Sequence, residues 1–516
     1  MNGTTIQPLE RVPTGIEKLD LILKGGFLRA GIYMIVGTPG AGKTIMGNQI
    51  CFNSVKHGVN TVFVTLLAET HARMLAHIHN MSFFDPKVVG DSLYYISGYS
   101  ALENDGLPGL LKFIRQVVRE RRANLLVMDG LATAQALSGR DIEYRRFLHE
   151  LQVFAETSGT TMFLLTQPGP EPSHSEHTMV DGLVTLYDRM VGPRAIRELE
   201  IGKLRGSDYL RGRHAYEISE HGIEVHPRTE TVLSNPPATD AEIRTRTAFG
   251  VPRLDEMLLG GILSNSTTAL LGAQGSGKTV LGLHFLNEGA RLGEKCLYFG
   301  FYETPSRLIA KAAQIGLDME QHVKDGLIDL IWHPALEHLP DALAEELLGA
   351  VSGKEARRVF IDGIEVFNDA LVYPERAPLF FTALTNELRA LEATTLLAAE
   401  LPDVFGPRVE FSVPRLAAIV DNIIFLRYVE LRSQLYRLIS ILKVRESAYD
   451  PSIREFSIST TGIEVATTFE SAEAILTGVA RPLPPGDAPH RTGTALMNEQ
   501  QDAIEDRSNQ RKSTGL

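Results

Sequence analysis

The feature that most constrains this chain is a phosphate-binding pattern that occurs twice in its 516 residues. Residues 37–44 read GTPGAGKT, and residues 272–279 read GAQGSGKT, an offset of 235 positions. Upstream, Gly25-Gly26 matches Gly260-Gly261 at the same offset, and downstream the letters GIEV recur at 222–225 and 462–465. Because the similarity runs through both halves, the chain is a duplication of one structural unit.

Each copy alternates short apolar runs with amphipathic stretches. In the first copy the apolar runs are YMIVG, TVFVTLL, LLVMDG and TMFLLTQ, and helix-like segments separate them. This alternation is typical of βαβ units in a parallel sheet. We therefore expect an α/β chain with two tandem P-loop domains, each a mostly parallel sheet flanked by helices.

The composition along the chain suggests where these domains begin and end. The segment HPRTETVLSNPPATDAEIRTRT is rich in proline and polar residues, so it is expected to contain the boundary. We expect a first domain over 1–230, a linker over 231–244 and a second domain over 245–477. Residues 478–516 contain few large apolar side chains, which predicts a flexible, disordered tail.

Both loops satisfy the pattern G-x-x-x-x-G-K-[ST] after an apolar strand-like run and before a helix-like stretch. The glycines let backbone N–H groups converge on phosphates, and the lysine reaches the β- and γ-phosphates. The alternative, a glycine-rich turn without a ligand, is much rarer for two copies in register. The expected nucleotide-binding residues are Gly37, Thr38, Pro39, Gly40, Ala41, Gly42, Lys43 and Thr44 in the first copy, and Gly272, Ala273, Gln274, Gly275, Ser276, Gly277, Lys278 and Thr279 in the second.

Four oxygen-bearing residues are candidates for binding Mg²⁺, which prefers octahedral oxygen ligands. Thr44 and Thr279 end the two loops, and Asp129 and Asp362 each end an apolar strand-like run. An aspartate at that position contacts the Mg²⁺ of a bound nucleotide in P-loop proteins. The alternative for each aspartate is a carboxylate that caps the next turn.

Glu69 and Glu303 are candidates for polarising the attacking water. They lie 25 and 24 residues after the loop threonines, each directly after a strand-like run. A carboxylate there can act as a general base. The alternative is an ordinary surface carboxylate.

The closing segments of the two copies resemble those of the KaiC family, whose members are double RecA-like ATPases. These segments read LEIGKLRGSDYLRGRHAYEISEHGIEV and IIFLRYVELRSQLYRLISILKVRESAYDPSIREFSIS. The resemblance implies two RecA-like domains, a hexameric ring, and nucleotide held between subunits. It also implies that Lys203 with Arg205, and Lys443 with Arg445, reach the γ-phosphate of a neighbouring subunit. A solvated strand end is the alternative for these basic pairs.

Two departures from the family pattern affect the expected activity. Where the clock proteins have consecutive glutamates, this chain reads Ala68-Glu69 and Tyr302-Glu303, so hydrolysis is expected to be slower or to use the remaining glutamate. The phosphorylated Ser-Thr pair of the family corresponds to Ala417-Ala418, which has no hydroxyl to phosphorylate. Ser412, a few residues upstream, is a weak substitute.

The expected function is hydrolysis of ATP with Mg²⁺ by a homo-oligomeric ring whose nucleotide state signals to a partner protein. A Ser/Thr autokinase of the KaiC type is one alternative. An ATP-sensing scaffold with negligible turnover is another, and RecA-type recombinases or ring helicases are a weaker one.

The net charge and the cysteine content limit which binding partners and which cellular location we expect for this protein. A formal net charge of −12 lacks the basic excess of nucleic-acid-binding proteins, so DNA is not an expected partner. Only Cys51 and Cys296 are present, and neither a secretory leader nor an apolar run of 18 residues is recognisable. We expect a cytoplasmic protein that does not enter a membrane.

Overall fold

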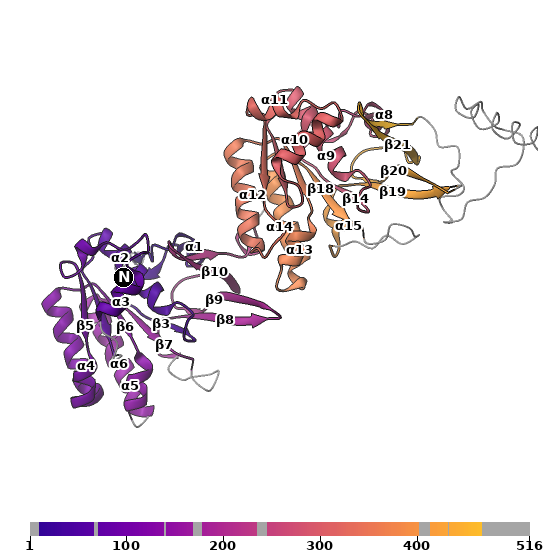
Figure 1. Ribbon diagram of the computed structural model, residues 1–516. Coiled ribbons are helices and arrows are strands. Elements are labelled where there is room, and N and C mark those ends of the chain that lie inside the picture. Colours follow the sequence, from indigo (N-terminus) through magenta and orange to yellow (C-terminus); the bar gives the residue numbers. More distant parts are fainter. Residues whose placement is uncertain are drawn as a thin grey trace, which may run out of the picture.

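The computed structural model describes residues 10–66, 71–138, 141–168, 178–234, 245–401, 413–431 and 433–466. These residues form two α/β domains in sequence, each built on a nine-stranded sheet with helices on both faces (Figure 1). The predicted fold class, two tandem RecA-like domains, is thereby confirmed. The expected tail, 478–516, lies outside the described residues.

In the first domain the sheet order is β11-β10-β9-β8-β3-β7-β6-β4-β5. The strands from β8 to β5 in that order are parallel, and β9, β10 and β11 extend the sheet antiparallel. The strands are β3 (Ile32–Gly37), β4 (Thr61–Thr65), β5 (Leu93–Ser97), β6 (Leu125–Asp129), β7 (Thr161–Thr166), β8 (Gly182–Val191), β9 (Arg194–Leu204), β10 (Arg213–Ser219) and β11 (Gly222–His226), with β1 (Arg11–Val12) and β2 (Phe27–Leu28) as a separate pair. The helices are α1 (Glu17–Ile22), α2 (Lys43–Lys56), α3 (His71–Ile78), η1 (Pro86–Val88), α4 (Tyr99–Arg121), α5 (Leu131–Leu137) and α6 (Asp141–Ser158).

The second domain repeats this topology with the order β22-β21-β20-β19-β14-β18-β17-β15-β16. Its strands are β14 (Thr267–Gly272), β15 (Cys296–Gly300), β16 (Ile328–Trp332), β17 (Arg358–Asp362), β18 (Thr394–Glu400), β19 (Asn422–Leu431), β20 (Gln434–Val444), β21 (Arg454–Ser459) and β22 (Gly462–Val465), with β12 (Arg246–Thr247) and β13 (Ile262–Leu263) paired separately. Its helices are α8 (Pro252–Met257), α9 (Lys278–Arg291), α10 (Pro305–Gln314), α11 (Met319–Lys324), α12 (Pro340–Lys354), α13 (Glu365–Ala370), η3 (Pro374–Arg376), α14 (Ala377–Ala390) and α15 (Leu416–Ile419).

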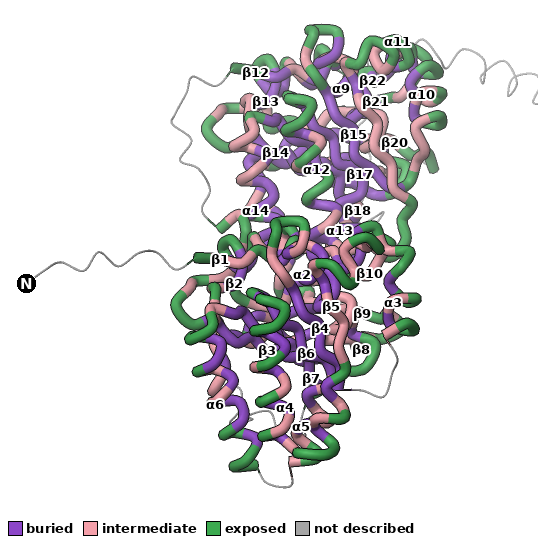
Figure 2. The backbone as a smooth tube through the Cα atoms, turned by 90° about the vertical axis from the view of Figure 1, so that its left-hand side faces the viewer, coloured by how far each residue is buried: buried purple, intermediate pink, exposed green. Residues whose placement is uncertain are grey.

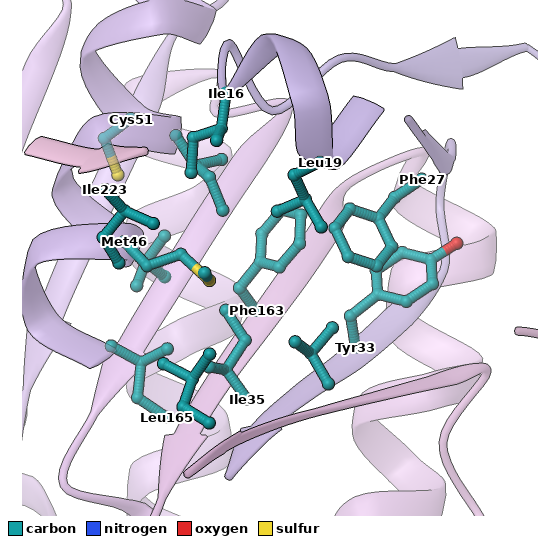
Figure 3. Packing of buried hydrophobic residues seen from close by; sticks show 14 of the residues in the cluster. Ile16, Leu19, Phe27, Tyr33, Ile35, Met46, Cys51, Phe163, Leu165 and Ile223 are labelled. Atoms are coloured by element: carbon teal, nitrogen blue, oxygen red, sulfur yellow. The ribbon is translucent and has the colours of Figure 1, made fainter. Parts of the chain in front are cut away.

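The central strand β3 shows why the apolar runs are continuous rather than alternating. Tyr33 and Ile35 pack on the face covered by α1 and α2, where Figure 3 shows Tyr33 beside Phe27 and Phe163. Met34 and Val36 pack on the opposite face, against α4 and α6. A parallel strand with helices on both sides buries both of its faces, so the side chains along it are predominantly apolar. Figure 2 shows this pattern as continuous buried strands in the middle of each domain.

A buried ionic cluster joins the two domains. The short helix α7 (Thr229–Val232) leaves the first domain, and its first residue donates from both N–H and hydroxyl to Asp341 Oδ1 at 2.9 Å. Arg376 donates to Glu230 and to Asp341, each at 2.8 Å. The Arg376 side chain is 13% exposed, so these charges are paired with one another rather than with water. The described helices include none with the length and apolarity needed to cross a membrane.

Candidate active sites

The first P-loop connects β3 to α2. Gly42 precedes the helix with φ at +88°, a left-handed conformation that favours glycine, and a Cβ there would lie 2.8 Å from Ile218 Cδ1 on β10. The same strand supports the loop through Tyr216, whose hydroxyl donates to the carbonyl of Ala41 at 2.6 Å. The loop is therefore held by β3, which precedes it in the chain, and by β10, which packs against it.

Lys43, the first residue of α2, folds its ammonium back over the loop. Nζ donates to the carbonyls of Gly37 at 2.7 Å and Thr38 at 3.0 Å. Burial lowers the pKa of Lys43, while the carboxylate of Asp129 opposes that shift. A partly desolvated ammonium next to exposed backbone N–H groups favours a phosphate ligand.

Thr44 and Asp129 meet although they are 85 positions apart. The Thr44 hydroxyl donates to Asp129 Oδ2 at 2.7 Å, because β6 ends beside the start of α2. A cavity of about 340 Å³ opens over these two residues and Lys43. Its other walls come from the P-loop, the first turn of α2, the segment after β6 and the end of β7, and they comprise Pro39, Gly40, Gly42, Ile45, Gly130, Ala132, Thr133, Leu165, Thr166 and Gln167.

The second P-loop repeats this arrangement between β14 and α9. Lys278 Nζ donates to the carbonyls of Gly272 at 2.7 Å and Ala273 at 3.0 Å, and Thr279 donates to Asp362 Oδ2 at 2.9 Å. Burial lowers the pKa of Lys278, as in the first site. The loop, lysine, threonine and aspartate expected from the sequence are thus brought together in both domains.

The paired threonine and aspartate oxygens suit a Mg²⁺ ion. They provide a hydroxyl and a carboxylate close enough to face one small cation. Across the described ranges, His, Cys, Asp and Glu form no group of three or more that could hold a metal ion by themselves. The remaining ligands would therefore be phosphate and water oxygens, which is how Mg²⁺ is held in nucleotide sites.

The two predicted water-polarising glutamates have different outcomes. Glu69 lies outside the described residues. Glu303 follows β15, and its carboxylate forms an ion pair with Lys311 of α10. Neither placement tests the predicted role.

The two basic pairs lie at one end of the parallel strands, and their own P-loops lie at the opposite end. Lys203 donates to the carbonyl of Val180 at 2.7 Å, and Arg205 donates to that of Thr178 at 2.7 Å. Just beyond, Asp181 accepts from the N–H of Ile32, the first residue of β3, whereas the P-loop follows the last residue of β3. Along a strand this separation is about 16 Å.

The pair in the second domain has the same placement. Lys443 donates to the carbonyls of Ala417 and Val420 at 2.8 and 2.7 Å, and Arg445 donates to Asp421 Oδ1 at 3.1 Å. The Arg205 and Arg445 side chains remain 51% and 46% exposed. The pairs therefore belong to the surface of the chain and not to its own phosphate cavities. Ser412 lies outside the described residues.

Three residues of the second site were missed by sequence reasoning. The Tyr298 hydroxyl donates to Asp362 Oδ2 at 3.2 Å, and the carboxylate of Glu365 accepts from the N–H of Glu400. Burial raises the pKa of Asp362, and the hydrogen bonds from Thr279 and Tyr298 counter that shift. A position-by-position comparison of the repeats would have found these residues, because the first domain has Phe63, Ala132 and Gln167 at the matching positions.

The fold and the duplicated lysine, threonine and aspartate geometry define a P-loop ATPase with two RecA-like domains. A family model described as the KaiC ATPase matches residues 12–230 and 247–470, and the chain belongs to the KaiC family. Among similar proteins, the circadian clock oscillator protein KaiC of Picosynechococcus sp. is 28% identical, over 92% of this chain and 93% of its own length. The KaiC proteins of Parasynechococcus marenigrum and Synechococcus elongatus are 26% and 27% identical, over 96% and 92% of this chain and 96% and 93% of theirs.

Proposed function

We propose that this protein hydrolyses Mg-ATP at both P-loops, in sites that are completed by a neighbouring subunit of a ring, and signals its nucleotide state to a partner protein. The observation that carries this proposal is the separation of the basic pairs from the phosphate cavities of their own domains. Lys43 and Lys278 lie over their own loops, whereas Arg205 and Arg445 are exposed at the opposite end of the strands and are available to the γ-phosphate of a neighbouring subunit.

In this mechanism each part of the chain has a separate role. Backbone N–H groups of the loops and the lysine ammonium bind and orient the phosphates. Mg²⁺, when bound, neutralises charge on the β- and γ-phosphates, and Thr44 with Asp129, or Thr279 with Asp362, would hold it. Exposed Arg205 and Arg445 stabilise the charge that develops on the γ-phosphate of the adjacent subunit.

A closed ring is the assembly that satisfies this geometry, because every subunit both receives and provides an arginine. We propose six subunits, the number that the resemblance to the KaiC family implies. ATP is expected to favour assembly, since nucleotide bound between subunits stabilises only the assembled state. Light scattering that shows a monomer at micromolar protein and saturating Mg-ATP would argue against the ring.

Nucleotide occupancy tests the two sites separately. Lys43→Ala and Lys278→Ala each remove one ammonium that lies over a loop, so the bound nucleotide per chain should fall in each folded variant. Circular dichroism verifies the fold, and chromatography of the released nucleotide measures occupancy. If one variant keeps full occupancy, that loop is not a nucleotide site.

The autokinase alternative gains no support from the described residues. The segment that corresponds to the family phosphosites is α15, which reads LAAI and contains no hydroxyl. Two of its carbonyls, those of Ala417 and Ala418, instead accept from Lys443 and Arg445. Incubation with γ-labelled ATP separates the activities, since free labelled phosphate is expected and labelled protein would favour the kinase.

A further inference from the structure

We propose that Glu400 accepts the proton of the attacking water in the second site and that Glu365 is its positioning residue. This inference rests on the proposed hydrolysis of ATP at that site. It assigns the role to a strand end different from the one that carries Glu303, the residue expected from the sequence.

The first site shows that the positions matching these two side chains line the cavity over the P-loop lysine. Ala132 and Gln167 line the cavity over Lys43. Ala132 follows Asp129 by three positions, as Glu365 follows Asp362. The second match comes from strand register, because β3 pairs Val36 with Thr166, which places Gln167 next to Gly37, just as β14 pairs Gly272 with Glu400.

Contacts in the second site hold Glu400 beside the P-loop lysine. The carbonyl of Gly272 accepts from Lys278 Nζ at 2.7 Å and from the N–H of Leu401 at 3.2 Å. Glu365, at the start of α13, accepts from the N–H of Glu400 and so fixes the end of β18. The charges agree with this proximity, since the Glu400 carboxylate is the strongest of three that oppose the lowering of the Lys278 pKa by burial.

Glu303 is less suited to accept a proton in this arrangement. Its Oε1 forms an ion pair with Lys311, which directs that oxygen toward α10. The hydrogen bond from its backbone N–H to Glu365 fixes Glu400 at the end of β18, and its carboxylate acts electrostatically on Lys278. The first domain has no carboxylate at either matching position, so this feature is specific to the second site.

The proposed step is an in-line displacement. The water oxygen bonds to the γ-phosphorus while the bond from that phosphorus to the β–γ bridging oxygen breaks. One water proton passes to the Glu400 carboxylate, and ADP and inorganic phosphate leave. Glu400 then returns the proton to solvent, so that no other reactant is needed.

The experiment uses the full chain with Lys43→Ala, which silences the first site, and measures phosphate release with Mg-ATP. Adding Glu400→Gln should lower kcat about 10²- to 10⁴-fold, the usual size of a general-base effect, while nucleotide occupancy stays unchanged. Glu303→Gln in the same background is the comparison for the residue expected from the sequence, and it should lower kcat much less than Glu400→Gln does.

Glu365 requires a separate comparison because it acts through Glu400. Glu365→Ala introduces the residue type that the first site has at the matching position, and it should lower kcat without a matching change in KM. Glu365→Gln retains an acceptor oxygen for the Glu400 N–H and should restore kcat. A rate that both substitutions reduce equally would overturn the positioning role.

The outcomes separate this inference from the proposed function. If Glu303→Gln abolishes turnover and Glu400→Gln preserves it, hydrolysis at the second site stands and the assignment to Glu400 is wrong. If the Lys43→Ala chain keeps nucleotide in its second site but releases no phosphate, the proposed hydrolysis there and this inference both fail.

Discussion

His284 makes the stability of the second domain depend on pH. Its ring is buried beneath β22, and Nε2 accepts from the N–H of Ile463 at 3.1 Å. Burial lowers the pKa of His284 from 6.5 to about 4. The first domain places Gln49 at the matching position, where its side-chain oxygen accepts from the N–H of Ile223 at 2.9 Å. The two side chains thus make the same contact, but only the histidine titrates.

The direction of this pH dependence follows from the fact that His284 is neutral in the folded state. Between pH 6.5 and about 4 the unfolded chain binds a proton that the folded chain does not, so stability is lost as the pH falls through this window. The lowered pKa corresponds to a loss of about 2 kcal/mol at pH 5 and about 3 kcal/mol at pH 4, relative to pH 7.5. These losses apply to the free energy of unfolding of the second domain, which contains His284.

The assay is urea unfolding of the full chain, followed by the fluorescence of Trp332, the only tryptophan. Trp332 ends β16, so it reports the second domain. His284→Gln copies the residue of the first domain, keeps an acceptor for Ile463 and removes the titration. The variant should lose about 2 kcal/mol less than the unsubstituted chain between pH 7.5 and pH 5. Equal losses in the two proteins would refute the reasoning.

Two further predictions concern the domain junction and the trans contacts. Arg376→Ala leaves Asp341 buried without its cation and leaves Glu230 paired with Arg228 alone, and it should destabilise the chain by about 3 to 5 kcal/mol in urea unfolding. Because Arg376 and Arg228 help to hold the pKa of Glu230 at about 2, this stabilisation is present above pH 4.5 and should be lost as the pH falls towards 2; a flat profile would contradict it. Arg205→Ala with Arg445→Ala should lower turnover but keep nucleotide occupancy, and mixing with a Lys43→Ala, Lys278→Ala chain should restore activity by rebuilding intact composite sites. No recovery despite verified mixing would mean that the arginines act within their own subunit or not at all.

The sequence alone determined the architecture and the nucleotide loops because both are written in local patterns. Continuous apolar runs such as YMIVG require strands buried on two faces, and β3 with its helices on both sides has that form. The loop glycines and lysines are adjacent in the chain, so their geometry needs few long-range contacts. Thr44 and Asp129 were also predictable, since parallel strands end at one edge of the sheet.

Other parts of the sites were decided only by the tertiary structure. Glu400 and Glu365 belong to segments 35 positions apart, and only the pairing of β18 with β14 places their contact beside Lys278. The ion pair of Glu303 with Lys311 depends on how α10 packs after its strand. The placement of Arg205 away from its own P-loop follows from the antiparallel return of β9 beside β8. Strand order and register arise from the packing of whole faces, and the local pattern of residues does not encode which distant side chains will meet.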